Sequence, residues 1–409
     1  MNKVIIVQKK EIRISSSNCC SCGACAAICP RTAIAMAADE EGFFYPLLDE
    51  AQCVHCGLCD KVCVYQNQMP PLSLKEVYAA VSRDTNVEKS ASGGLFASFA
   101  QAVLAQNGAV YGCALEYENG RLWPRHICVT DPKERYRLQG SKYVQSDLGN
   151  CYRDAEQRLK QGQVVLFSGT PCQVAGLKGF LRQEYSNLYT IDIVCHGVPS
   201  TKLFHEYISF EEKKLGAAVV DFHFRDKSQG WKLYGSMTLD NGRTVYFETE
   251  ESSYYQMFLN SYTYRENCYT CPYASDHRPG DITIGDYWCI ELVHPELLAE
   301  NGGPLDHEKG VSCMIVNNDH GQALLGTYGG GILRWPSTYE KASKYNHQLI
   351  GPSQLKPERE TVLSLSRENY EKVEAWYRRR LIPIRINRAV RAMIPRSIKD
   401  IVKAALGRK

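Results

Sequence analysis

The sequence predicts three parts: a small α+β domain rich in cysteine, an α/β domain with a mixed sheet, and a basic helical tail. Nine of the eighteen cysteines precede residue 64. Apolar runs with strand character alternate with helical stretches between residues 77 and 215. Eleven Lys or Arg and one Asp lie between residues 378 and 409. These observations give domains at 1–70, 75–355 and 356–409.

The composition is that of a globular protein. With 44% hydrophobic and 23% charged residues, the chain is neither disordered nor fibrous. A secreted disulfide scaffold would be far shorter and would follow an apolar signal segment, whereas residues 1–17 contain only the short apolar run 4–7. The cysteines therefore indicate metal or redox chemistry in a reducing compartment. No stretch approaches the roughly 18 apolar residues of a membrane span, so we expect a cytoplasmic protein.

The first domain contains the pattern C-x2-C-x2-C-x3-C twice. In two-cluster ferredoxins, three cysteines of each copy bind one [4Fe–4S] cluster and the fourth binds the other cluster. The predicted ligands are Cys19, Cys22, Cys25 and Cys63 for one cluster, and Cys53, Cys56, Cys59 and Cys29 for the other. A pair of zinc sites is the alternative, but zinc gives no reason for this doubled three-plus-one spacing. Cys20 has no place in the pattern. The first domain is therefore predicted to be ferredoxin-like.

The remaining elements follow in chain order. Residues 33–36 and 43–45 are predicted strands of the first domain, and Pro70–Pro71 marks a linker. In the second domain we expect strands at 77–81, 109–114, 164–168 and 189–194, and helices at 94–105, 150–160 and 202–215. This alternation favours a largely parallel sheet. Residues 240–242, Asp-Asn-Gly, lie between strands 235–239 and 244–248 and predict a hairpin, so the domain also has antiparallel strands.

Glycine and cysteine turns interrupt the α/β pattern. Ser90-Ala-Ser-Gly-Gly precedes a helix, and Gly169-Thr-Pro-Cys-Gln follows a strand. Each turn offers backbone N–H groups to a phosphate, or simply caps a helix. Four further cysteines also fall in turns, two of them as C-x2-C before a proline: Cys172, Cys195, Cys268 and Cys271. They are candidate ligands of a third [4Fe–4S] cluster; the alternative is that the first two are packing residues.

An ordered set of motifs over about residues 1–320 resembles one family. The motifs are the doubled cysteine pattern, SGG at 92–94, GSKYVQS at 140–146, GTPCQVAGLK at 169–178, DIVCHGVPS at 192–200, FRDK at 224–227, CYTCPYASDHRPGDITIGDYW at 268–288 and GVS at 310–312. The chain resembles the family of coenzyme F420 hydrogenase/dehydrogenase beta subunits. That family includes the β subunits of F420-reducing hydrogenases and formate dehydrogenases, and 7-hydroxymethyl chlorophyll a reductase.

The resemblance implies a flavoprotein, with FAD in a cleft of the α/β domain and iron–sulfur clusters that exchange electrons with it. The implied flavin contacts are Ser92, Gly93, Gly94, Lys142, Tyr143, Gly169, Thr170, Pro171 and Gln173. Lys142 would stabilise charge on the pyrophosphate or on reduced flavin, or else form a surface salt bridge. His196 would donate a proton to substrate or flavin, or else hydrogen-bond its own turn. Lys142 and His196 are thus the predicted catalytic residues.

The tail is strongly basic, whereas the rest of the chain is acidic. Its eleven basic residues and one acid give a net charge of +10, against +3 for the whole chain. Interspersed apolar residues suit an anionic surface at the inner face of the membrane or an acidic partner. A solvated helix packed on the chain's own acidic body is the alternative. No nucleic-acid partner is expected.

We expect an iron–sulfur, flavin-dependent oxidoreductase that passes electrons between [4Fe–4S] clusters and FAD. Its substrate is not identified by the sequence, and its carrier is an F420-like deazaflavin, a ferredoxin or a nicotinamide. One alternative is an electron-transfer subunit that docks on a partner enzyme. Another is an iron–sulfur protein without flavin that serves polysaccharide biosynthesis at the membrane surface.

Overall fold

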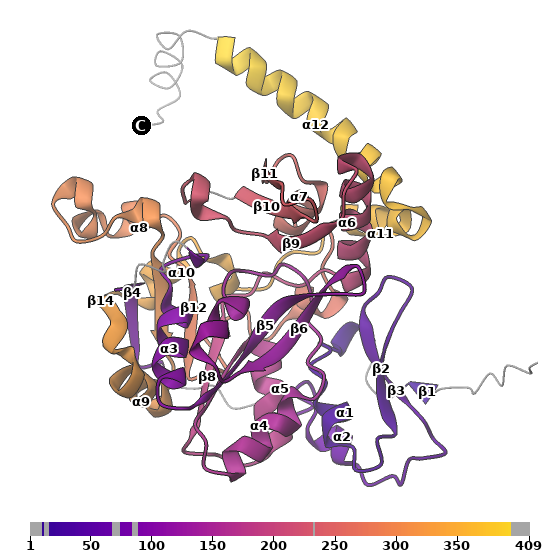
Figure 1. The fold of residues 1–409 in the computed structure, drawn as a ribbon, viewed down its shortest axis with the longest axis vertical. Helices are drawn as coiled ribbons and strands as arrows, with labels where there is room; N and C mark the ends of the chain where they lie inside the picture. Colours follow the sequence, from indigo (N-terminus) through magenta and orange to yellow (C-terminus); the bar gives the residue numbers. More distant parts are fainter. Residues whose placement is uncertain (1–9, 12–15, 68–73, 84–88, 232–233, 394–409) are drawn as a thin grey trace, which may run out of the picture.

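A mixed sheet of eight strands forms the centre of this computed structural model, which describes residues 10–11, 16–67, 74–83, 89–231 and 234–393. Its strand order is β14-β4-β13-β12-β8-β7-β5-β6 (Figure 1). The strands are β4 Glu76–Ser82, β5 Ala109–Glu118, β6 Arg121–Val129, β7 Val165–Gly169, β8 Leu188–Ile193, β12 Ile282–Asp286, β13 Ser312–Val316 and β14 Ile332–Pro336. The second part of the chain therefore has the mixed α/β architecture that the sequence predicts.

Within the described residues, the parallel pairings of this sheet join only four adjacent strands, β12, β8, β7 and β5. The other strands pair antiparallel, so the expectation of a largely parallel sheet is wrong for the flanks. The turn between β5 and β6 shows the reason. Asn119 and Gly120 both have positive φ, 52° and 76°, and make a tight turn that needs no crossover helix.

Helices cover both faces of the central strands. The helices are α3 Leu95–Leu104 and α9 Asp319–Tyr328 on one face, and α4 Cys151–Lys160 and α5 Pro171–Leu181 on the other. Side chains alternate along the strands: Val110 and Leu166 face the first pair of helices, whereas Tyr111 and Phe167 face the second. Parallel β7 and β8 end at the same edge of the sheet, so the turns that follow them meet there.

A second, three-stranded sheet has the order β11-β10-β9. Its strands are β9 Val219–His223, β10 Tyr234–Leu239 and β11 Thr244–Glu248, and its helices are α6 Thr201–Leu215, α7 Ser253–Leu259, α11 Glu358–Glu368 and α12 Tyr370–Met393. The predicted hairpin forms, with Thr238 opposite Thr244. It belongs to this separate sheet because its apolar side chains, such as Met237 and Phe247, pack with Phe204, Tyr254 and their neighbours.

The N-terminal unit is a small sheet with two short helices, and it lies against α4 and α5 (Figure 1). The elements are β1 Lys10–Glu11, α1 Ala24–Ile28, β2 Ile34–Ala38, β3 Phe44–Leu48 and α2 Leu58–Lys61. Two glycines of α5 lie at the contact with this unit. A Cβ atom on Gly176 would lie 2.8 Å from Cβ of Cys22, and one on Gly179 would lie 2.9 Å from the carbonyl oxygen of Val62. Because glycine has no side chain, the N-terminal unit can pack closely on α5 at these two positions.

Replacing Gly176 with alanine is expected to destabilise the protein by about 1–3 kcal/mol, the usual cost of overpacking. The methyl group would also lie 2.7 Å from Oη of Tyr152, so the N-terminal unit must move. Gly326 of α9 is the matched control because nothing lies within 4 Å of its added Cβ. Gly326→Ala should stabilise the helix by up to about 1 kcal/mol. Denaturant unfolding measures both; equal stability of the two variants would contradict the predicted contact.

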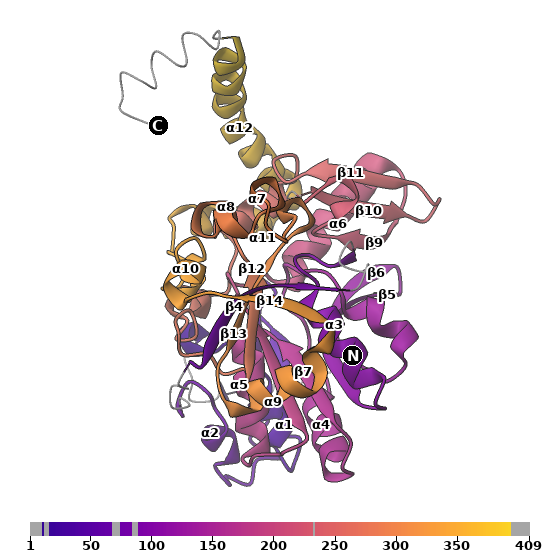
Figure 2. The same ribbon diagram turned by 90° about the vertical axis from the view of Figure 1, so that its left-hand side faces the viewer.

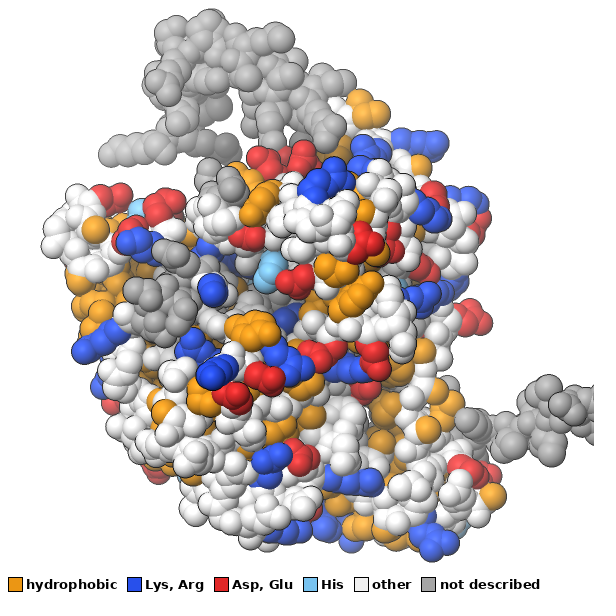
Figure 3. Space-filling view, in the orientation of Figure 1, with side chains coloured by type: hydrophobic (Ala, Val, Ile, Leu, Met, Phe, Trp, Pro, Cys, Tyr) orange, Lys and Arg blue, Asp and Glu red, His pale blue; other side chains and the backbone are white. Residues whose placement is uncertain are grey.

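Helix α12 extends away from the body in two perpendicular views (Figures 1 and 2). On the face shown in Figure 3, Lys and Arg side chains lie among Asp and Glu side chains rather than in one patch. Residues 394–409, which hold five of the eleven basic residues of the tail, lie outside the described residues, as do the linker residues 68–73. Within the described part of the chain, no helix has both the length and the apolar character that crossing a membrane requires.

Candidate functional site

The two cysteine loops of the N-terminal unit turn in the same way. Gly23 and Gly57 have φ of 72° and 69° and begin α1 and α2, a left-handed conformation that favours glycine. Backbone N–H groups donate to cysteine sulfurs: Ser21 to Cys19 at 3.4 Å, Ala33 to Cys29 at 3.3 Å and His55 to Cys53 at 3.4 Å. Such bonds favour the thiolate form that binds iron. The donor set therefore fits iron–sulfur clusters.

The two repeats face each other. Burial raises the pKa of Cys25 to about 12, and the charges of Cys19, Cys63 and Cys59 add to the effect. Burial also raises the pKa of Cys19 and is the largest cause of that shift, and the charge of Cys63, from the second repeat, adds to it. Cys63 therefore lies near Cys19 and Cys25, and the crosswise assignment stays a prediction. In the residues described, no three His, Cys, Asp or Glu side chains converge as the ligands of one metal ion do; in a [4Fe–4S] cluster each thiolate binds its own iron.

The four cysteines of the predicted third set come from three elements. Cys172 lies in the first turn of α5, Cys195 follows β8, and Cys268 and Cys271 lie in and after the 3-10 helix Glu266–Thr270. Burial raises the pKa of Cys195 to about 12 and that of Cys271 to about 11, and the charge of Cys172 adds to both shifts. The other three cysteines all act on Cys268. The fold thus brings the four thiols near one another.

Cys20 joins this group, which sequence reasoning missed. It is 6% exposed and packs beside Cys172, Cys22 and Cys271. The pKa of Cys20 lies well above its usual range; its hydrogen bond with Cys172 lowers it, whereas its hydrogen bond with Cys22 and its burial raise it more. No local signal in the sequence marks Cys20, because its partner Cys172 lies more than 150 positions away.

A buried ion pair ties the strand before Cys195 to the loop after Cys271. Asp192 accepts hydrogen bonds from Nη2 and Nε of Arg278, at 2.6 and 3.1 Å, and from the N–H of Gly280 at 2.7 Å. The Arg278 side chain is 1% exposed and that of Asp192 is 0% exposed. Arg278 also donates to the carbonyl oxygens of Tyr273 and Ile193. This pair positions two of the three elements that carry the third set of cysteines.

A cleft of about 290 Å³ opens at the edge where β7 and β8 end, close to the lower bound of roughly 300–1,000 Å³ for ligand sites. Ten predicted residues line it: Ser92, Gly94, Lys142, Tyr143, Gly169, Thr170, Cys172, Gln173, Cys195 and His196. Gly93 and Pro171 are not among the lining residues. A Cβ on Gly93 would lie 2.6 Å from the carbonyl oxygen of Ala80, so this glycine permits close packing against β4 and β13.

The ionisable groups of the cleft are partly buried, or fully buried in the case of His126. Burial lowers the pKa of Lys142, whose Nζ donates to the carbonyl oxygen of Gln139 at 2.6 Å. Burial also lowers the pKa of His196, and its carbonyl oxygen accepts from Ser353. Sequence reasoning missed His126: burial lowers its pKa to about 4, and its ring bonds Ser146 and the carbonyl oxygen of Ser168. The cleft therefore favours neutral over charged imidazoles.

Asp286, at the end of β12, is a second lining residue that the sequence did not indicate. Its Oδ2 accepts from Nη1 of Arg225 at 2.9 Å. Its Oδ1 is buried and has no hydrogen-bond partner among the described residues. Because a buried acceptor without a partner is costly, this atom fits a ligand that donates an N–H or O–H group. The indole of Trp288, which also lines the cleft, stacks on Trp231 at 5.5 Å.

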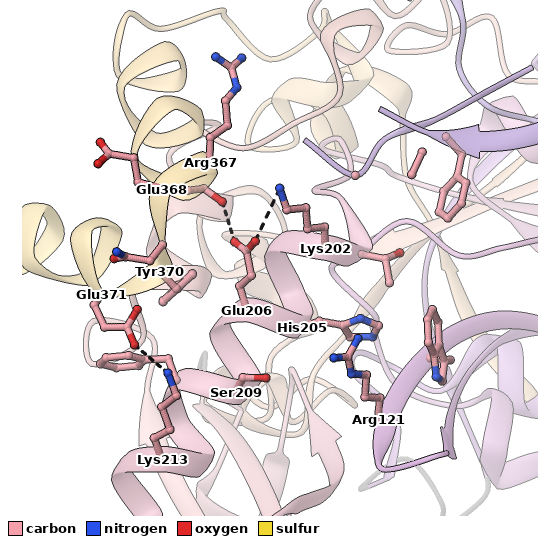
Figure 4. A pocket seen from close by; sticks show the side chains of 18 residues that line it. Arg121, Lys202, His205, Glu206, Ser209, Lys213, Arg367, Glu368, Tyr370 and Glu371 are labelled. Atoms are coloured by element: carbon pink, nitrogen blue, oxygen red, sulfur yellow. Dashed lines mark hydrogen bonds and ion pairs between the residues drawn. The ribbon is translucent and has the colours of Figure 1, made fainter. Parts of the chain in front are cut away.

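A second cavity, of about 600 Å³, lies between the N-terminal unit, α6 and the junction of α11 with α12 (Figure 4). Two ion pairs lie in its wall, Lys213 with Glu371 at 3.0 Å and Lys202 with Glu206 at 3.8 Å. Ser366 also donates to Glu206 at 2.7 Å. The Lys213–Glu371 pair and the Ser366–Glu206 hydrogen bond join α6 to the C-terminal helices, so this cavity lies at an interface between elements of the chain.

Comparison with known proteins agrees with these features. Residues 162–328 match the family model for the C terminus of coenzyme F420 hydrogenase/dehydrogenase beta subunits, and residues 18–67 match the 4Fe-4S dicluster domain. The chain is 25% identical over 226 residues to the F subunit of F(420)H(2) dehydrogenase from Methanosarcina mazei, covering 51% of this chain and 60% of that one. It is 26% identical over 193 residues to the coenzyme F420-dependent sulfite reductase of Methanocaldococcus jannaschii, covering 46% and 29%.

The chain therefore spans only part of the length of these two relatives. A chain of the F420-reducing [NiFe] hydrogenase complex from Methanosarcina barkeri aligns with 75% of this chain and 92% of its own length, with 14% identity and a TM-score of 0.43. The family match confirms the resemblance inferred from the motifs, and the dicluster match confirms an iron–sulfur domain. Over residues 162–328 the chain is thus similar to the C terminus of coenzyme F420 hydrogenase/dehydrogenase beta subunits, and it carries an N-terminal 4Fe-4S dicluster domain.

Proposed function

We propose that the chain is an iron–sulfur flavoprotein that transfers electrons between its N-terminal clusters and an organic substrate through FAD bound in the cleft. One observation carries the proposal. The cleft lined by the predicted flavin residues is also lined by Cys172, Cys195 and Cys20, and Cys20 packs beside Cys22 of the N-terminal unit. The iron–sulfur unit and the cleft are therefore in contact. FAD, when bound, would exchange single electrons on one side and electron pairs on the other.

The chain's own residues have separate roles in this proposal. Ser92 and Gly94 lie at the N-terminus of α3, which favours an anion such as a pyrophosphate. Lys142 supplies a partly buried cation on the same cleft wall, held by backbone carbonyl oxygens. Oδ1 of Asp286 offers an acceptor that has no partner among the described residues. Tyr143 stacks on Phe258 at 4.3 Å and makes that wall apolar, which excludes water from the reacting atoms.

The third cluster is part of the proposal, with Cys172, Cys195, Cys268 and Cys271 as its ligands. Anaerobically purified protein should contain about twelve irons per chain with three clusters and about eight with two. Cys195→Ala should lose about four of the twelve. The matched control is Cys313→Ala, because Cys313 is a fully buried cysteine of β13 that no cluster uses. A wild-type protein with about eight irons, or equal iron content in the two variants, would contradict the proposal of a third cluster.

Absorption of the same preparation tests the flavin. We expect flavin bands that bleach when a reduced deazaflavin, a reduced ferredoxin or a reduced nicotinamide is added. The carrier that bleaches them identifies the redox partner. Iron–sulfur bands without flavin would contradict the cleft assignment and favour the alternative, an electron-transfer subunit that docks on a partner enzyme.

A further inference from the structure

Arg265 is the largest side chain that is fully buried, at 0% exposed. It lies between the N-terminal unit and the cysteine turns of the second domain. Its guanidinium donates from Nη1 to the carbonyl oxygen of Cys19 at 2.8 Å, from Nη2 to that of Phe44, and from Nε to Oε1 of Gln145 at 3.3 Å. Its backbone N–H donates to Val198, and its carbonyl oxygen accepts from Cys268. One residue therefore contacts both cysteine regions.

No carboxylate among the described residues forms an ion pair with this guanidinium. Its neighbours are neutral carbonyl and amide groups and two aromatic rings, with Tyr45 at 4.3 Å and Phe43 at 5.4 Å from the guanidinium carbon. Burial raises the pKa of the Asp39 carboxyl overall. The hydrogen bonds that this carboxyl accepts from the N–H groups of Phe43 and Glu41 lower its pKa, and the charge of Arg265 lowers it by a smaller amount. Buried charges are ordinarily paired, because carbonyl groups and rings repay only part of the loss of hydration. A buried arginine in this setting requires a closer anion.

The other groups nearby that can become anions are cysteine thiols, which bind a cluster as thiolates. The guanidinium lies beside the first cysteine loop, because its Nη1 donates to the carbonyl oxygen of Cys19 at 2.8 Å. Among the described residues, none of the hydrogen bonds of Arg265 reaches the second repeat. A cluster bound by four thiolates carries net negative charge and gains one more on reduction. A fixed cation beside it therefore stabilises the reduced form more than the oxidised form.

We propose that Arg265 is the buried counter-charge of the cluster held by Cys19, Cys22, Cys25 and Cys63, and that it raises the reduction potential of that cluster relative to its neighbour. Electrons would then collect at the cluster nearer the cleft. Arg265 acts through the thiolates and is a positioning residue. The inference rests on the dicluster domain and not on flavin, so a flavin-free protein would leave it intact.

The test is a redox titration of the anaerobically purified full chain, followed by electron paramagnetic resonance. Arg265→Gln should make one-electron reduction of one cluster at least tenfold less favourable, a shift of about 59 mV to lower potential. The cluster of Cys53, Cys56, Cys59 and Cys29 should keep its potential. Arg265→Lys retains the charge and should stay close to the wild type.

Arg153 is the matched control. Like Arg265, it donates to carbonyl oxygens of a cluster loop, those of Ala27 at 2.8 Å and Cys29 at 3.3 Å, but from an exposed position. Arg153→Gln should leave both potentials unchanged because water screens its charge. An unchanged potential in Arg265→Gln, or an equal shift of both clusters, would overturn the proposal. If Arg265→Gln fails to hold its iron, retention of iron by Arg265→Lys supports the counter-charge and loss from both variants refutes it.

Discussion

Asp192→Ala should lower the free energy of unfolding by about 3–5 kcal/mol, the usual cost of removing one partner of a buried ion pair. The variant leaves the guanidinium of Arg278 without its carboxylate in a site that is 1% exposed, and it also leaves the N–H of Gly280 without an acceptor. Denaturant unfolding of the full chain measures the effect. Because the pair joins the elements that carry Cys195 and Cys271, the same variant should lose iron at the third set of cysteines.

Glu371→Ala is the matched control for this experiment. Glu371 pairs with Lys213 at 3.0 Å, but both side chains are more than half exposed, and such pairs contribute roughly 0–1 kcal/mol. A double variant that replaces Asp192 and Arg278 with apolar residues should recover part of the lost stability, because no unpaired buried charge remains. Equal effects of Asp192→Ala and Glu371→Ala would show that the buried pair contributes no more than a surface pair.

Removal of iron should unfold the N-terminal unit while the rest of the chain stays folded. The apolar core between the two repeats contains Ile34 and Leu48 but otherwise consists mainly of cysteines, and a unit of this size buries little apolar surface. Its folding free energy therefore comes largely from metal binding. Chelation under reducing, anaerobic conditions followed by trypsin should cleave at the exposed residues Arg31 and Lys61.

The iron-loaded protein is the control for this digestion, and both sites should then resist trypsin. The second domain provides an internal reference, because its helix-covered sheet needs no metal for its core. An N-terminal unit that resists trypsin equally with and without iron would show that its own packing suffices.

The sequence predicts the 4Fe-4S dicluster domain well because its cysteine spacing is local. Three cysteines within seven residues must follow one loop, and the spacing alone indicates the cluster type. The strands and helices around the cleft are likewise encoded by short apolar runs. In contrast, Asn119 and Gly120 give a hairpin that the alternation of strands and helices did not reveal, so the flanks of the sheet were predicted with the wrong direction.

Contacts between distant residues could not be predicted. Arg265 and Cys19 are separated by 246 positions, and only the docking of the N-terminal unit brings them together. The cysteine spacing of the first domain does not include Cys20, and its contact with Cys172 is visible only in the folded chain. Asp286 is distinguished by an atom without a partner, a property that depends on every surrounding residue and that no motif records.

Helix α5 fixes the spacing between the two cysteine regions. Cys172 lies in its first turn, and Gly176, one turn later, receives Cys22. A rise of about 1.5 Å per residue places these two positions about 6 Å apart along the helix axis. If both regions hold clusters, the tunnelling distance between them is set by one rigid helix. Electron transfer across this contact would then need no swinging of the N-terminal unit, and its rate would not depend on solvent viscosity.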